Sequence, residues 1–256
     1  MSATASRPPS APGAAPAASV PTAASAPSAV AALAAIEREV VDCRACPRLV
    51  AWRELVAREK RASFAGETYW GRPIPGFGDA AARVVILGLA PAAHGANRTG
   101  RVFTGDRSGD FLFAALHRTG FASQPTSRHV DDGLRCKDAW ITAAVRCAPP
   151  ANKPTPAERD RCLPFAAREL EQLAEVRVIL CLGAFAWDAA LRLLTVRGVA
   201  AARPRPRFAH AAELELPGAP LLLGVFHPSQ QNTFTGRLTP PMLDAVLLRA
   251  RALAGL

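Results

Sequence analysis

Four of the six cysteines form two pairs whose spacing could bring them to one metal. The stretch DCRACPRL carries Cys43 and Cys46 with two residues between them, and Cys147 and Cys162 follow with fourteen residues between them. Four thiolates bind zinc or a [4Fe–4S] cluster. The wide second spacing, across a proline-rich loop, suits a bulky cluster better than a single ion, but spacing alone leaves both open.

The other two cysteines show no such pairing. Cys181 lies in the apolar run VILCLGAFA and is expected in the core. Cys136 lies in the polar stretch DDGLRCKDA and receives no role. A disulfide framework is not expected, because the sequence shows no secretory signal. We therefore expect a cytoplasmic protein.

Three polar segments rich in glycine or proline each follow a short apolar run. They read GLAPAAHGANRTGRVFTGDRSG (88–109), RCAPPANKPTP (146–156) and HPSQQNTFTGRLT (227–239). The first holds five glycines and three arginines, which is more glycine than a loop needs for solubility. Glycine lets a backbone approach a ligand closely. The composition therefore raises the question of whether this loop holds a phosphate or a nucleotide base.

The elements that must position these segments alternate between apolar runs and stretches of helical period. Runs at 83–87, 139–145, 176–182 and 220–226 are apolar on both faces, as in central parallel strands. Helices are expected at about 29–41, 108–119, 156–174, 184–195 and 240–254. The alternation predicts an α/β fold with helices on both faces of a parallel sheet. In such sheets ligands bind beyond the carboxyl ends of the strands, which is where the three polar segments converge.

Two of the expected helices begin with threonine followed by proline. Thr155 is predicted to be an N-cap, and Glu158, three residues later, completes a capping box. The stretch TPPMLDAV repeats the same device at Thr239.

Composition separates the first part of the chain from the rest. Residues 1–28 contain 22 Ala, Pro and Ser, and we predict that this tail is disordered. Residues 29–256 are expected to form one domain, and no apolar run approaches the roughly 18 residues that a membrane span needs.

The net charge of +10 comes from an excess of arginine. It supports nucleic acid binding, although a GC-rich genome would produce the same bias.

Together, the three segments and the four cysteines resemble the iron–sulfur uracil-DNA glycosylases of bacteria and archaea, most closely family 5 (type B). The resemblance runs from about residue 40 to 250 and implies a three-layer α/β/α sandwich on a short, four-stranded parallel sheet. It implies a monomeric, monofunctional glycosylase that flips a deaminated base from double- or single-stranded DNA and hydrolyses the bond to the sugar. It also implies a structural [4Fe–4S] cluster on the paired cysteines named above.

Catalytic candidates follow from the chemistry of base removal, which leaves a cationic sugar and an anionic base. Related families carry a polar catalytic residue early in the first segment, but GLAPAAHG lacks it. Asp106 is the nearest carboxylate and could position water, although its alternative role is the N-cap of the next helix. Asn152 is a second candidate, or a simple turn former. His227 could donate a hydrogen bond to the base carbonyl.

The base pocket is expected to use the first segment and the end of the second strand. Glycines 88, 95 and 100 would let backbone amides approach the base, and Phe103 would stack on it or else lie in the core beneath the loop. Family 4 enzymes carry a base-reading Asn where this chain has Ala143, so we expect a broad base range: uracil, hypoxanthine and xanthine. The expected pocket residues are Gly88, Ala92, Ala93, His94, Phe103 and Ala143.

DNA contacts are expected from the first and third segments. Ser229 and Asn232 could contact phosphate, as could Asn97 and Arg98 if they are not simply solvated loop residues. Arg237 or Leu238 could enter the gap left by the flipped base.

Two other classes of protein remain open. One is a catalytically inert iron–sulfur DNA-binding protein on the same scaffold, favoured by the missing polar residue in the first segment. The other is a zinc-stabilised nucleotide hydrolase, which the absence of a GxxxxGK[ST] phosphate loop weakens.

Overall fold

A mostly parallel sheet organises the part of the chain that the structure, a computed structural model, describes: residue 1 and residues 28–256. Its six strands are β1 (Phe77–Gly78), β2 (Val84–Gly88), β3 (Ala139–Ala143), β4 (Val178–Leu182), β5 (Glu213–Leu214) and β6 (Leu221–Val225). They lie in the order β1-β3-β2-β4-β6-β5. The four central strands are parallel, and β1 and β5 are antiparallel edges.

The expectation of four strands was therefore too low by the two edge strands. Each edge strand has only two residues, so neither leaves an apolar run that a sequence pattern could reveal. The four expected runs match the central strands, and all or nearly all residues in these strands are buried. This burial on both faces is typical of a central parallel sheet.

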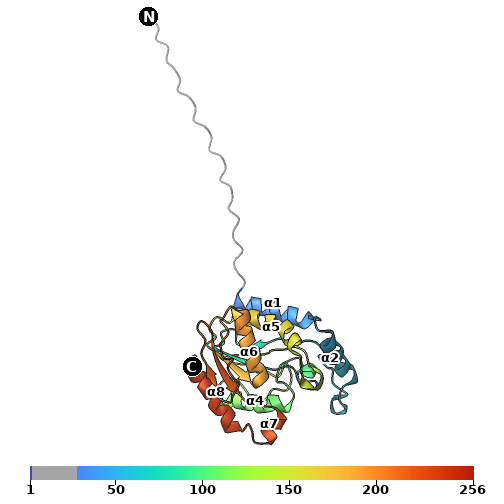
Figure 1. The fold of residues 1–256 in the computed structure, drawn as a ribbon. Coiled ribbons are helices and arrows are strands. Elements are labelled where there is room, and N and C mark those ends of the chain that lie inside the picture. Colours follow the sequence, from blue (N-terminus) through green and yellow to red (C-terminus); the bar gives the residue numbers. More distant parts are fainter. Residues whose placement is uncertain (2–27) are drawn as a thin grey trace.

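The helices cover both faces of the sheet (Figure 1). One face packs against α4 (Arg107–Arg118) and α8 (Pro240–Ala254) through residues such as Phe113 and Leu247. The other packs against α1 (Ala29–Asp42), α5 (Pro156–Gln172) and α6 (Ala184–Val196) through residues such as Leu163 and Trp187. The expected three-layer α/β/α arrangement is confirmed, and Cys181 lies fully buried in β4 as expected.

Helix boundaries follow the capping chemistry. Thr155 accepts from Glu158 N at 3.2 Å and Glu158 accepts from Thr155 N at 2.8 Å, so the capping box is confirmed. Thr239 is the N-cap residue of α8, as expected, but among the described residues its side chain makes no capping bond. Pro240 at the first helical position still favours the helix start there.

Further helices lie in the segments that surround the sheet. They are α2 (Pro47–Glu59), α3 (Ala96–Thr99) and α7 (Gln230–Phe234), with 3-10 turns at Ala62–Phe64 and Pro150–Asn152. The sequence analysis missed α2, although Pro47 starts it directly after Cys46. Ser28 caps α1, while the predicted disorder of the preceding tail falls on residues 2–27, outside the described residues. Among the described helices, none combines the length and apolar character needed to cross a membrane.

Candidate active site and cysteine cavity

A cleft of about 950 Å³ lies at the carboxyl ends of the parallel strands. All three polar segments contribute to its walls, through Ala92 and Asp106 from the first, Asn152 from the second and His227 from the third. The predicted convergence of the segments is therefore confirmed.

Asp106 serves as a helix cap and faces the cleft at the same time. Its Oδ1 accepts from Gly109 N at 2.9 Å, which makes it the N-cap of α4. Burial raises the pKa of Asp106, while hydrogen bonds from the backbone N–H groups of Gly109 and Ser108 oppose the rise. A Cβ at Gly95 would collide with this carboxylate, so glycine is required to leave room for it. The N-cap role is therefore confirmed, and the same residue lines the cleft, where its catalytic role stays a prediction.

Asn152 lies exposed at the mouth of the cleft. Both Asn152 and Ala151 have left-handed backbones, with φ of 55° and 51°. Two consecutive residues other than glycine in this region are uncommon and cost energy. The turn holds the Asn152 side chain at the cleft.

His227 lies two residues after the end of β6 and lines the cleft near Phe103, with their ring centroids 6.1 Å apart. Burial lowers the pKa of His227 to about 4, so the ring is neutral near pH 7 and can donate one N–H. Asn232 Nδ2 donates to the His227 carbonyl at 2.8 Å, and Ser229 Oγ accepts from Asn232 N at 3.4 Å. Asn232 and Ser229 therefore fix the backbone that carries the histidine.

His94 lines the cleft and is oriented by a tyrosine that the sequence analysis missed. Tyr69 Oη lies 3.1 Å from His94 Nδ1, and the two rings meet edge to face. Burial, with the charges of Arg61 and Arg98, lowers the pKa of His94. Tyr69 is the only tyrosine in the chain, which was the one signal that could have drawn attention to it.

The expected base pocket is partly corrected by the structure. Ala92, Ala93 and Phe103 line the cleft, but Gly88 and Ala143 do not. Gly88 lies under Phe103, because a Cβ there would come 2.9 Å from the ring, and Ala143 is buried in the same core. Gly88 thus makes room for the Phe103 ring, while Gly95 lines the cleft, and the approach of its backbone amide to a base stays a prediction.

Three expected DNA contacts are corrected as well. Asn97 is fully buried and Leu238 is 1% exposed, so neither can reach DNA from these positions. The guanidinium group of Arg98 is occupied by contacts within the protein. It donates to His94 O at 2.9 Å and to Gly105 O at 2.8 Å, and it forms an ion pair with Glu67. Asn97 and Arg98 are held by polar contacts within the protein, and Leu238 is apolar and packs in the core.

The rim of the cleft carries an exposed aromatic residue that was also missed. Phe234 on α7 is 68% exposed, and the Arg107 guanidinium lies 5.5 Å from its ring centroid. The expected residue Arg237 is exposed but lies over the Phe226 ring at 4.7 Å. The signal for Phe234 was a lone aromatic among polar residues in QQNTFTG.

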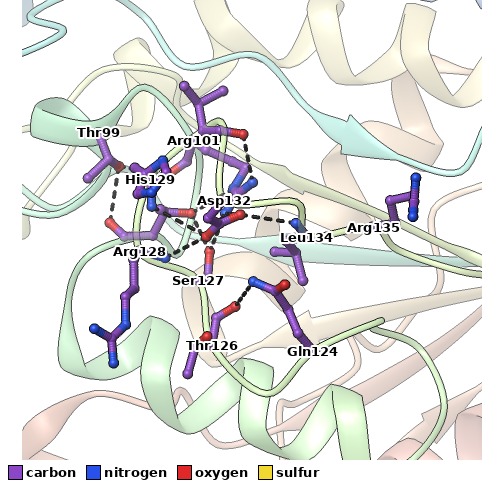
Figure 2. A network of polar contacts seen from close by, with 12 residues as sticks. Thr99, Arg101, Gln124, Thr126, Ser127, Arg128, His129, Asp132, Leu134 and Arg135 are labelled. Carbon is purple, nitrogen blue, oxygen red and sulfur yellow. Dashed lines mark hydrogen bonds and ion pairs between the residues drawn. The ribbon is translucent and has the colours of Figure 1, made fainter.

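A buried ion pair fastens a neighbouring loop to the first polar segment. Arg101 Nη2 donates to both carboxylate oxygens of Asp132 at 2.8 and 2.7 Å (Figure 2). Burial alone would raise the pKa of Asp132, but the Arg101 bond and two backbone N–H groups outweigh it and lower the pKa to about 2. Gly105 N donates to Ser127 O at 2.9 Å, so the network holds the backbone next to the N-cap of α4.

The four paired cysteines line a second cavity. Cys43 and Cys46 come just before α2, Cys147 follows β3, and Cys162 lies on α5. Burial raises the pKa of Cys162 to about 12 and also raises the pKa of Cys147. Among the residues that the structure describes, no three His, Cys, Asp or Glu side chains are grouped so as to hold a metal ion. The fold nevertheless brings both sequence pairs to one place, while Cys136 lies elsewhere, in a bridge with Ala122.

Comparison with known proteins agrees with this geometry. Residues 75–251 match the model of the family described as the uracil DNA glycosylase superfamily. A type-5 uracil-DNA glycosylase of Mycobacterium bovis is 58% identical over 215 residues, which is 84% of this chain and 79% of the relative. One from Thermus thermophilus is 53% identical over 222 residues, covering 87% and 98% of the two chains. A type-4 enzyme of Archaeoglobus fulgidus is 26% identical, covering 76% and 80%. The chain therefore belongs to the uracil-DNA glycosylase superfamily.

Proposed function

We propose that this protein removes uracil from DNA by hydrolysing the bond between base and deoxyribose, leaving an abasic site. The observation that carries the proposal is the convergence of Asp106, Asn152 and His227 on one cleft in a chain of this family. The neutral His227 ring donates a hydrogen bond to the departing base, which becomes anionic. The Asp106 carboxylate positions water and stabilises the cationic sugar, with Asn152 as the second candidate for holding water.

The base range is broad. Leu89 to Ala93 line one wall of the cleft with side chains that carry no hydrogen-bonding group. A wall of this kind selects by shape, and shape discriminates by only about 1–3 kcal/mol. The enzyme thus acts on uracil opposite guanine or adenine and in single strands, and also on hypoxanthine and xanthine. Weakly paired bases are favoured, because flipping them costs less.

The gap left by the flipped base is filled from the rim of the cleft. Phe234 takes this role in place of Leu238, which is buried. An exposed aromatic ring can stack between bases, and Arg107 beside it can contact a phosphate. That the enzyme works as a cytoplasmic monomer stays a prediction.

A [4Fe–4S] cluster is held by Cys43, Cys46, Cys147 and Cys162. The donor set fits, because four thiols line one cavity and the buried guanidinium of Arg53 donates to Cys147 Sγ at 2.9 Å. Such a cation is suited to an anionic cluster with four thiolate ligands. When bound, the cluster supplies a rigid cross-link between the start of α2, the end of β3 and α5.

Purified protein with a uracil-containing oligonucleotide, scored for abasic sites by alkaline cleavage, tests the activity. Parallel substrates with hypoxanthine and xanthine test the base range, and an absorbance band near 400 nm together with the iron content tests the cluster. Tight DNA binding without cleavage would favour an inert iron–sulfur DNA-binding protein. Zinc in place of iron would refute the proposed cluster but would not contradict the proposed glycosylase activity.

A further inference from the structure

Arg53 on α2 is a buried cation at the cysteine cavity. Its side chain is 2% exposed, and it donates to Cys147 Sγ at 2.9 Å and to the Cys43 carbonyl at 3.2 and 3.3 Å. The nearest carboxylate oxygen, on Glu54, is 4.0 Å away, and Glu54 already forms a two-pronged pair with Arg44. The Arg53 side chain therefore fixes α2 to the cysteine site.

The main-chain carbonyl of Arg53 makes a separate contact, with α3. Asn97 Nδ2 donates to the Arg53 carbonyl at 3.2 Å, in a fully buried contact between α2 and α3. Asn97 N in turn donates to the carbonyl of Ala92, a residue that lines the cleft, at 3.1 Å. One unbroken series of contacts thus runs from Cys147 through Arg53 and Asn97 to Ala92.

We propose that Asn97 is a positioning residue through which the cysteine-bound cluster, anchored by Arg53, holds the Ala92–Gly95 wall of the cleft in its active position. The proposal rests on the cluster and the excision activity proposed above. Neither residue touches substrate: Asn97 acts through Ala92, and Arg53 acts through α2. A wall displaced by about 1 Å can cost on the order of a hundredfold in rate, which makes a buried link of this kind matter to catalysis.

Asn97→Leu removes the amide donor and keeps the size of a buried side chain. We expect it to retain full iron content and bind uracil-containing DNA within about twofold of the wild type. Its single-turnover excision rate should fall at least tenfold. Gln124→Met is the matched control, because Gln124 also donates its amide to a main-chain carbonyl, that of Thr126 at 3.0 Å, away from the cleft (Figure 2). This control should keep the wild-type rate.

Hydrogen exchange gives a readout that does not depend on activity. In Asn97→Leu, amides in the segment 92–97 should exchange several-fold faster, while those of α4 and α8 keep their protection. Should Asn97→Leu prove insoluble, Asn97→Asp, which keeps the size but replaces the donor by a carboxylate, serves for the same comparison. Unchanged exchange in this segment, or an unchanged excision rate, would overturn the proposal.

A double-mutant cycle tests the link to the cysteine site. Arg53→Met breaks the bond to Cys147 but keeps the carbonyl that Asn97 contacts, and Arg53→Lys should partly rescue it. If the two residues act in series, the double variant Arg53→Met/Asn97→Leu excises about as slowly as the slower single variant. If the losses of excision rate in the two single variants multiply in the double variant, coupling through α2 is refuted. A wild-type protein without iron would instead refute the proposed cluster, and one without excision would refute the proposed function.

Discussion

Asp106→Asn separates the two roles of the carboxylate at the N-terminus of α4. Asparagine has the same shape and keeps an oxygen that can accept from Gly109 N, now at 2.9 Å. It is as good an N-cap as aspartate, whereas Asp106→Ala loses the cap at a cost of about 1 kcal/mol. Because burial raises the pKa of Asp106, the charged form is disfavoured by folding, and its destabilising effect grows as pH rises through that pKa. We therefore expect Asp106→Asn to be as stable as the wild type at neutral pH, or more stable.

The effect on excision should be much larger than the effect on stability. A carboxylate that positions and activates water contributes about 10²- to 10⁴-fold in rate, which is roughly 3–5 kcal/mol of transition-state stabilisation. Both Asp106→Asn and Asp106→Ala should lose this factor, with DNA affinity nearly unchanged. The wild-type rate should rise with pH as Asp106 loses its proton, through a midpoint above the usual aspartate value of about 3.9. In Asp106→Asn this rise should be absent.

Single-turnover excision with enzyme in excess over a uracil duplex measures the chemical step, and urea unfolding measures stability in the same samples. Asp131→Asn, a change at an exposed carboxylate outside the cleft, is the control. A folded Asp106→Asn protein that excises uracil at the wild-type rate would remove Asp106 from the mechanism. Asn152 would then be the residue to test for holding water.

Three further outcomes are expected. Cys162→Ser should lower the iron content and the absorbance near 400 nm, while Cys136→Ser keeps both; full iron in Cys162→Ser would contradict the ligand set. Asp132→Asn should lower the free energy of unfolding by about 2–3 kcal/mol at pH 7, because a pKa of about 2 lies roughly two units below the usual value. This loss should shrink as pH falls from about 4 to 2, where the wild-type carboxylate takes up its proton, and a pH-independent difference in urea unfolding would argue against the ion pair. Phe234→Ala should slow excision from a paired duplex more than from a single strand, and equal losses on both substrates would speak against insertion into the stack.

Much of the fold followed from the apolar pattern and from capping. The central strands are buried on both faces, so their runs are continuous and easy to recognise, and Thr155 with Glu158 marked the start of α5 correctly. The edge strands could not be predicted from the sequence, because a strand of two residues is recognised only by the strand with which it pairs. Thr239 shows the same limit for caps, since the residue type permits a capping bond but does not enforce it.

For the candidate site, residue types and segment positions predicted the location of the cleft but not the direction of each side chain. Asp106 and His227 lie where the loop order placed them. Asn97 on the short helix α3 and Leu238 just before α8 turned inward, and this depends on tertiary packing. Ala143 lies on β3 as expected, but it is buried in the same core cluster as Phe103, and its pairing with Gly88 is fixed only by the sheet register.

The two short antiparallel edges also limit how copies of the protein can meet. An exposed sheet edge is a template on which another chain can add a strand, and long flat edges promote aggregation. Here β1 and β5 each offer only two residues, and the backbone of Gly78 at the end of β1 has φ of 141°, which interrupts regular extension. The parallel strands with their continuous apolar runs lie inside, between these edges. Strand addition between copies is therefore disfavoured at both edges of the sheet, and the most hydrophobic strands are kept away from those edges.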